Sequence, residues 1–146
     1  MIFERSGNRC GGRSSKVYLI GLYPTEAQTQ RDRELYEATF RAISIVYDVN
    51  FQIAQHPEEL MGLKSIPHVS LEMPNQHTQA LETFEHPEEA VYVVGNSQYW
   101  APAHQLSRVD HRIHVPTPEL PTPGPEKTLY GFQILPIVLQ DRYAKI

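Results

Sequence analysis

The chain has 146 residues, which is enough for one domain with a hydrophobic core but not for two large ones. Its 13 Lys and Arg residues against 17 Asp and Glu residues give a net charge of −4, which excludes a basic protein that coats nucleic acid indiscriminately. The sequence has no apolar run near the roughly 18 residues of a membrane helix and no apolar signal segment in residues 1–15, and its only cysteine is Cys10. We therefore expect a soluble protein of the reducing cytoplasm.

Residues 1–16 form a basic segment. They sum to a charge of +3, whereas residues 17–146 sum to −7. Several glycines and serines make a helix or a strand unfavourable here, so we expect an irregular arm ahead of a single domain, residues 17–146. Its basic residues could contact phosphates; the alternative is an ordinary frayed terminus.

Strands and helices alternate after the arm. Short apolar runs bounded by glycine, proline or polar residues predict strands at 17–22, 49–54, 69–73, 90–95 and 112–115. Short helices are expected to begin near His56 and Pro102. This alternation predicts an α/β domain with a mainly parallel sheet flanked by helices.

Two longer helices are expected. Residues 28–47 show the spacing of an amphipathic helix, with apolar residues every three or four positions. These residues are Leu35, Ala38, Ala42, Ile45 and Val46. Residues 129–143 are apolar almost all round, which predicts a helix buried in the core or against a second subunit, with a kink at Pro136.

Common catalytic and metal motifs are missing from the sequence. His111 and His114 are three apart on a predicted strand, which places them on opposite faces, and His104 has no close carboxylate or cysteine partner. The sequence contains no G-x-S-x-G elbow, phosphate-binding loop with lysine, or G-x-G-x-x-G fingerprint. We therefore expect no metal site and none of the common nucleotide folds.

Ligands of open parallel sheets bind beyond the carboxyl ends of the strands. Gly95 and Pro116 mark two such ends, and five prolines lie within the ten residues from Pro116 to Pro125. A glycine lets a ligand approach the backbone, and a loop stiffened by prolines could read an adenine through fixed carbonyls. Alternatively, Gly95 only turns the chain and the prolines form a rigid surface connection.

A series of short motifs resembles, in order, RNA methyltransferases of the SPOUT superfamily, TrmH-like (SpoU) branch. The resemblance covers the chain from about Lys16 onward. The motifs are Ile20-Gly21-Leu22-Tyr23, Phe40-Arg41-Ala42, Ile66-Pro67, Phe84-Glu85-His86-Pro87-Glu88, Ala90-Val91-Tyr92 with Gly95, Val115-Pro116-Thr117 and Leu139-Gln140-Asp141-Arg142. The resemblance implies an α/β fold with a C-terminal trefoil knot, and a homodimer through helix 129–143. It also implies S-adenosylmethionine held in the knot and methylation of a ribose 2′-hydroxyl in tRNA or rRNA.

The resemblance also assigns roles to residues. Arg41 matches the arginine that such enzymes place near the target ribose, and we assign it to stabilising the alkoxide and positioning a phosphate, because guanidinium stays protonated. The matched cofactor-binding positions are Val94, Gly95, Asn96, Val115, Pro116, Thr128, Leu129 and Tyr130. The candidate RNA-binding residues are Arg5, Arg9, Arg13, Arg31 and Arg33.

The chain departs from the family pattern at several positions. Leu35 and Glu37 replace an asparagine and a glycine, Ser97 replaces a glutamate and Tyr130 replaces an asparagine, and the proline-rich loop is longer. Tyr130 could stack on a base or the adenine, or could plug the cofactor pocket. Arg41 could also be a solvated residue on the polar face of its helix. The alternative function is therefore a catalytically degenerate dimer that serves as an RNA- or protein-binding module.

Overall fold

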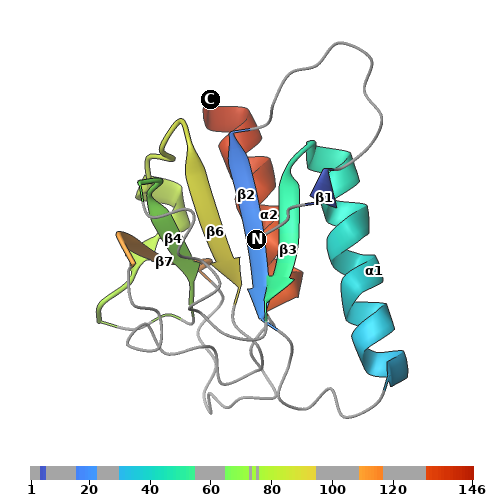
Figure 1. The fold of residues 1–146 in the computed structure, drawn as a ribbon. Coiled ribbons are helices and arrows are strands. Elements are labelled where there is room, and N and C mark those ends of the chain that lie inside the picture. The colour runs from blue at the N-terminus through green and yellow to red at the C-terminus, as the bar shows by residue number, and fades with distance from the viewer. Residues whose placement is uncertain are drawn as a thin grey trace.

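The computed structural model is organised around a seven-stranded sheet of order β1-β3-β2-β6-β4-β7-β5 (Figure 1). The strands are β1 (Glu4–Arg5), β2 (Val17–Leu22), β3 (Asn50–Ala54), β4 (His68–Leu71), β5 (Gln79–Ala80), β6 (Ala90–Val94) and β7 (His111–His114). The strands from β2 to β7 run parallel to their neighbours, and β1 pairs antiparallel with β3. The structure describes residues 4–5, 16–22, 30–54, 65–72, 74, 76–94, 109–116 and 131–146. The predicted α/β class with a mainly parallel sheet is confirmed.

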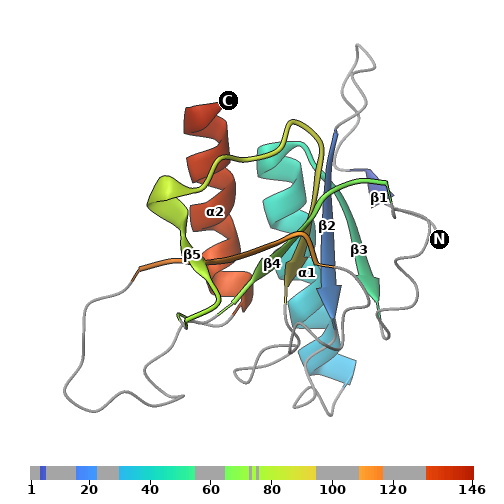
Figure 2. The same ribbon diagram turned by 90° about the vertical axis from the view of Figure 1, so that its left-hand side faces the viewer.

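The helices α1 (Gln30–Tyr47) and α2 (Gly131–Lys145) lie on the same side of the sheet (Figure 2). A short 3₁₀ helix, η2 (Leu81–Thr83), follows β5. Both α-helices and the strands share one hydrophobic core, to which α2 contributes Ile134, Leu135, Val138 and Leu139. The Tyr47 hydroxyl, at the end of α1, also lies 3.2 Å from the Gln140 amide oxygen on α2. None of the helices in the described ranges is long and apolar enough to cross a membrane.

Strand β6 is buried along its whole length. Ala90, Tyr92 and Val94 belong to the core beneath the helices, and the alternating residues Val91 and Val93 are buried on the other face. A continuous apolar run is typical of a parallel strand with both faces covered. This apolar run is the reason why the sequence predicts a strand from Ala90 onward.

Helix α1 was correctly expected, but the apolar series that predicted it does not form its buried face. The core side of α1 consists of Tyr36, Phe40 and Ile43. Several residues of the expected series are instead exposed: Leu35 at 59%, Ile45 at 49% and Val46 at 69%, with Ala38 and Ala42. Two apolar series run along the helix, and the one with the larger aromatic side chains is buried because it removes more apolar surface from water.

The prediction of an irregular arm over residues 1–16 is wrong at Glu4 and Arg5. These two residues form β1 and pair with Phe51 and Asn50 of β3, so part of the arm covers an open sheet edge. Lys16 precedes β2 and forms an exposed ion pair with Glu88, with 2.7 Å between Nζ and Oε1. Residues 1–3 and 6–15 lie outside the described part.

Helix α2 agrees with the predicted C-terminal helix over 131–143 and continues through Pro136. The predicted short helices near His56 and Pro102 lie outside the described residues. Most of the proline-rich loop also lies outside the described residues, which include Pro116 and Gly131 but not residues 117–130.

Candidate functional site

The carboxyl ends of the parallel strands meet along one edge of the sheet, which we call the carboxyl edge (Figure 1). Its residues are the last ones of the strands: Leu22, Ala54, Leu71, Val94 and His114. Helix α2 begins at this edge and runs back along the sheet (Figure 1). The segments that the sequence assigned to a cofactor therefore leave or approach the same edge.

The strand register shows how two of these segments are aligned. Leu71 of β4 pairs with Val94 of β6 on one side and with Ile113 of β7 on the other. Val94 is fully buried, Val115 packs against the core and Pro116 is exposed. The structure thus brings Val94 level with the end of β4, and Val115 and Pro116 follow at the same edge, two and three residues after Ile113. The other assigned residues, Gly95, Asn96, Thr128, Leu129 and Tyr130, lie outside the described part.

The topology marks a second feature of this edge. The neighbouring strands β2 and β6 continue in opposite directions, because the chain runs from β2 to β3 on one side and from β6 to β7 on the other. Ligands of open parallel sheets bind outside the carboxyl ends at such a reversal. Here the reversal lies beside Leu22 and Val94, which supports the carboxyl edge as the candidate site.

A bidentate ion pair lies at the carboxyl edge, on the sheet face opposite the helices. Arg112 of β7 donates from Nε and Nη2 to the two carboxylate oxygens of Glu72, at 2.7 and 2.6 Å. The Glu72 side chain is only 7% exposed, and its hydrogen bonds raise the pKa of Arg112. The pair fastens the end of β4 to β7. Sequence reasoning missed it, because no local spacing joins residues 40 positions apart.

The predicted placement of His111 and His114 on opposite faces of their strand is confirmed. His111 lies edge-on to Phe84, with 5.4 Å between ring centroids, whereas His114 Nδ1 lies 2.8 Å from the Thr78 hydroxyl. Within the described residues, no group of three or more His, Cys, Asp and Glu side chains could hold a metal ion.

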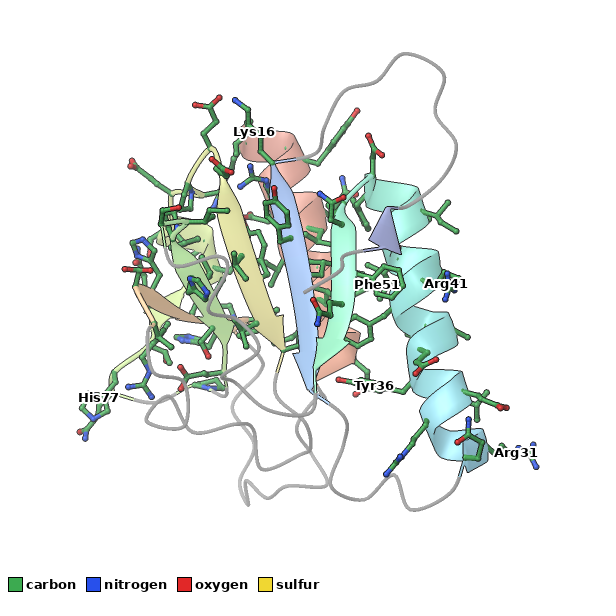
Figure 3. All side chains as sticks on the ribbon, viewed as in Figure 1. Lys16, Arg31, Tyr36, Arg41, Phe51 and His77 are labelled. Atoms are coloured by element: carbon green, nitrogen blue, oxygen red, sulfur yellow. The ribbon has the colours of Figure 1, made fainter. Side chains whose placement is uncertain are left out.

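Arg41 lies away from the carboxyl edge of its own chain. It is exposed in the middle of α1, with its guanidinium carbon 5.4 Å from the centroid of the Phe51 ring (Figure 3). It follows the first residue of the helix, Gln30, by 11 positions, or about 16 Å along the axis. The structure therefore does not bring Arg41 together with Val94, Val115 and Pro116 within one chain.

The candidate RNA-binding arginines are divided between two places. Arg31 and Arg33 are exposed at the start of α1, where Arg31 points away from the protein (Figure 3). Arg5 belongs to β1, paired with Asn50 at the start of β3, toward the opposite edge of the sheet. Arg9 and Arg13 lie outside the described part.

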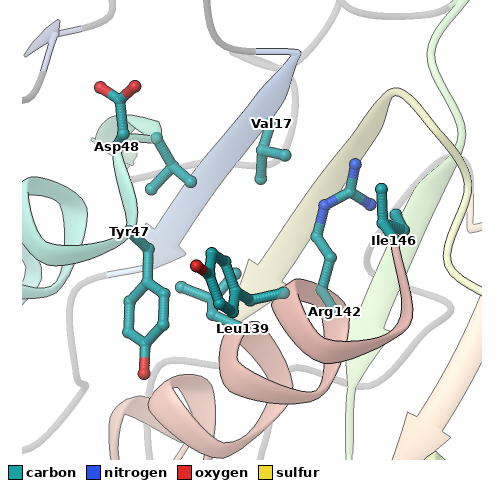
Figure 4. A pocket seen from close by; sticks show the side chains of 8 residues that line it. Val17, Tyr47, Asp48, Leu139, Arg142 and Ile146 are labelled. Atoms are coloured by element: carbon teal, nitrogen blue, oxygen red, sulfur yellow. The ribbon is translucent and has the colours of Figure 1, made fainter.

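A cavity of about 440 Å³ lies at the opposite, amino edge of the sheet (Figure 4). It is formed where α1 ends, β2 begins and α2 ends. Its lining residues are Val17, Tyr47, Asp48, Val49, Leu139, Arg142, Tyr143 and Ile146. Nothing in the sequence pattern predicted this cavity, because its walls come from three distant segments.

A solved structure with a similar fold is the crystal structure of an AdoMet-bound rRNA methyltransferase from Sinorhizobium meliloti. The two superpose with a TM-score of 0.59 at 11% sequence identity, over 90% of this chain and 57% of that chain. No family model and no curated protein matches the sequence. The likeness is therefore one of fold, and this chain spans little more than half the length of that protein.

Proposed function

We propose that this protein is an S-adenosylmethionine-dependent RNA methyltransferase of the SPOUT superfamily, TrmH-like branch, acting on a ribose 2′-hydroxyl of tRNA or rRNA. The observation that carries the proposal is the meeting of Val94, Val115 and Pro116 with the start of α2 at the carboxyl edge. The similar fold of an AdoMet-bound rRNA methyltransferase over 90% of this chain supports it. The proposal includes the trefoil knot that the resemblance implies.

The described residues at the carboxyl edge suit a nucleoside cofactor. Val115 offers partly exposed apolar surface beside the buried Val94, and Pro116 presents a carbonyl without a competing amide hydrogen. Gly95, Asn96 and the Thr128–Tyr130 segment would complete the site. S-adenosylmethionine supplies an electrophilic methyl group when bound, and the chain's task is to hold it and to align the ribose with it.

The cofactor part of the proposal is tested by titration calorimetry with S-adenosylmethionine and S-adenosylhomocysteine. We expect saturable binding of both, and weaker binding by Pro116→Ala. Pro67→Ala is the matched control, because Pro67 precedes β4 at the amino edge and should leave binding unchanged. A protein that ignores both compounds at millimolar concentration would contradict the proposal and favour the degenerate binding module.

We further propose that the active form is a homodimer that packs through α2. Ile137 is 43% exposed on α2, although Leu135 and Val138 on either side of it are fully buried. Helix α1 exposes its second apolar series, including Ile45 and Val46. One chain leaves both of these surfaces in water. A second copy would cover them, and burial of apolar area would drive the association.

We expect light scattering to give about twice the 16.7 kDa mass of the chain for the natural sequence. Ile137→Glu should shift the mass toward that of one chain, because burial of an unpaired carboxylate in the interface is costly. Gln76→Glu adds the same charge at an exposed loop residue and should leave the dimer intact. A mass near 16.7 kDa for the natural sequence would refute the dimer.

A further inference from the structure

A buried chain of hydrogen bonds connects α2 to β6 at the amino edge of the sheet. Its central residue is His86, whose side chain is completely buried just before β6. His86 Nε2 lies 2.7 Å from Asp141 Oδ2 on α2, and His86 Nδ1 lies 2.6 Å from the Tyr92 hydroxyl on β6. Both ring nitrogens of this histidine are thus engaged.

Arg142 and Lys145, at the two ends of this series of hydrogen bonds, indicate where its protons lie. Arg142 donates from Nη1 to the Tyr92 hydroxyl oxygen at 3.1 Å, and Lys145 Nζ donates to Asp141 Oδ2 at 2.9 Å. Arginine and lysine can only donate, so the Tyr92 oxygen accepts and its own proton goes to His86 Nδ1. In the described part of the protein, the Tyr92 hydroxyl makes no other hydrogen bond that could take this proton. The arrangement that gives every one of these protons an acceptor is a neutral His86 with its proton on Nε2, donated to Asp141.

With a proton on His86 Nδ1, the Tyr92 hydroxyl would have to turn its own proton away and accept from both His86 and Arg142. The hydroxyl proton would then lose its acceptor, and a charge would be placed on a side chain that is itself completely buried. The cost is raised by two positive groups of α2, because Arg142 and Lys145 flank the ring. Asp141 favours the added charge but already accepts from Lys145. The remaining neighbour is aromatic: the Phe84 ring lies edge-on to His86, with 5.0 Å between centroids, and His111 of β7 lies beyond it.

The carboxylates nearest in sequence to His86 do not offset this cost. Glu85, Glu88 and Glu89 are all exposed, and Glu88 pairs with Lys16. Burial is the largest influence and lowers the pKa of His86, with opposing contributions from Asp141 and supporting ones from Arg142 and Lys145. Burial alone would raise the pKa of Asp141, but the hydrogen bonds from His86 and Lys145 outweigh it and keep the pKa below its usual value.

We propose that His86, Tyr92, Asp141, Arg142 and Lys145 form a pH-sensitive lock, which holds the last turns of α2 against β6 most firmly while His86 is neutral and favours their release when His86 is protonated. Hydrogen bonds from Arg142 and Lys145 to backbone carbonyls between residues 81 and 88 hold the helix end at either pH. The lock adjoins the cavity at the amino edge, whose walls include Arg142, Tyr143 and Ile146 (Figure 4). Release would therefore reshape that cavity and leave the carboxyl edge in place.

The direction of the pH dependence follows from the lowered pKa of His86. The unfolded or released histidine takes up its proton near pH 6.5, before the locked one does. The stabilising effect of the lock is complete above that pH and is lost as the pH falls below it. Each pH unit below 6.5 raises the population of the released state by up to about tenfold, until the locked histidine also becomes protonated.

The lock is tested by NMR of the histidine side chains in the intact protein. At pH 7.5 we expect His86 to be neutral with its proton on Nε2. Tyr92→Phe removes the donor to Nδ1 and should raise the pKa of His86, whereas Asp141→Asn removes the attractive charge and should lower it further. The signals of the other histidines serve as the internal control. A proton found on Nδ1 at pH 7.5, or the same His86 titration in both variants, would overturn the proposal.

Hydrogen exchange provides a second readout that does not depend on the variants folding well. After correction for intrinsic rates, the amides of residues 139–145 should exchange up to about tenfold faster at pH 5.5 than at pH 6.5, relative to the amides of α1. Equal protection of α2 and α1 across this range would contradict release of the helix end. The test uses the natural sequence without cofactor or RNA, so its outcome is independent of the proposed methyltransferase activity.

Discussion

Replacement of Arg41 by alanine should lower the rate of RNA methylation about 10²–10³-fold, the usual loss when one charge-stabilising donor is removed from a transition state. The fold should survive, because Arg41 is exposed and its contact with the Phe51 ring is of a kind that contributes only about 0.5–1 kcal/mol. The measurement is transfer of a labelled methyl group to bulk tRNA and rRNA, accompanied by a thermal melt. Arg31→Ala, at the start of the same helix, is the matched control and should weaken RNA binding more than the rate at saturating RNA.

A mixing experiment with two variants tests where Arg41 acts. Arg41 lies about 16 Å along α1 from the helix start at the carboxyl edge. We propose that in the dimer it acts on a ribose bound at the carboxyl edge of the second copy. Arg41→Ala mixed with Pro116→Ala should then regain activity, because one of the two sites in a mixed dimer is intact. No recovery on mixing would place Arg41 outside the reaction or within its own chain's site. Full activity of Arg41→Ala alone would leave the residue as a solvated surface arginine.

The order of the five longer strands and the two α-helices was predictable because it depends on local apolar patterns, whereas the two-residue strands β1 and β5 and the short helix η2 were not predicted. The apolar runs from Val17 to Leu22 and from Ala90 to Val94 indicate buried strands with no knowledge of their neighbours. The buried side of α1 was not predictable in this way. Leu35, Ile45 and Val46 follow helical spacing as well as Tyr36, Phe40 and Ile43 do, and only the sheet beneath decides which series is covered.

The candidate site was likewise predictable in part from the sequence and in part only from the structure. The ends of β6 and β7 could be proposed as ligand-binding positions because glycine and proline punctuate the sequence there. Their alignment on either side of Leu71 required the strand order, which places β4 between them although β4 precedes both in sequence. The Glu72–Arg112 pair and the His86–Asp141 contact join residues 40 and 55 positions apart, and no spacing rule connects such residues.

Leu135→Ala should lower the free energy of unfolding by about 2–5 kcal/mol, the range for truncation of a buried leucine. Leu135 is completely buried in the core that α2 shares with α1 and the sheet, so the smaller side chain leaves a cavity that rigid neighbours fill only in part. Chemical denaturation followed by circular dichroism measures the change. A loss below about 1 kcal/mol would mean that α2 packs less tightly on the sheet than it does in the structure.

Ile137→Ala, two residues along the same helix, is the matched control for this substitution. Ile137 is 43% exposed in one chain, so in a monomer its truncation should cost clearly less than that of Leu135. In the proposed dimer Ile137 is covered by the second copy, and its cost should then grow as the protein concentration rises above the dissociation constant of the dimer. The Leu135 effect arises within one chain, so it should appear at every concentration. The comparison of the two variants at low and high protein concentration therefore separates packing of α2 on its own sheet from packing of α2 on a partner.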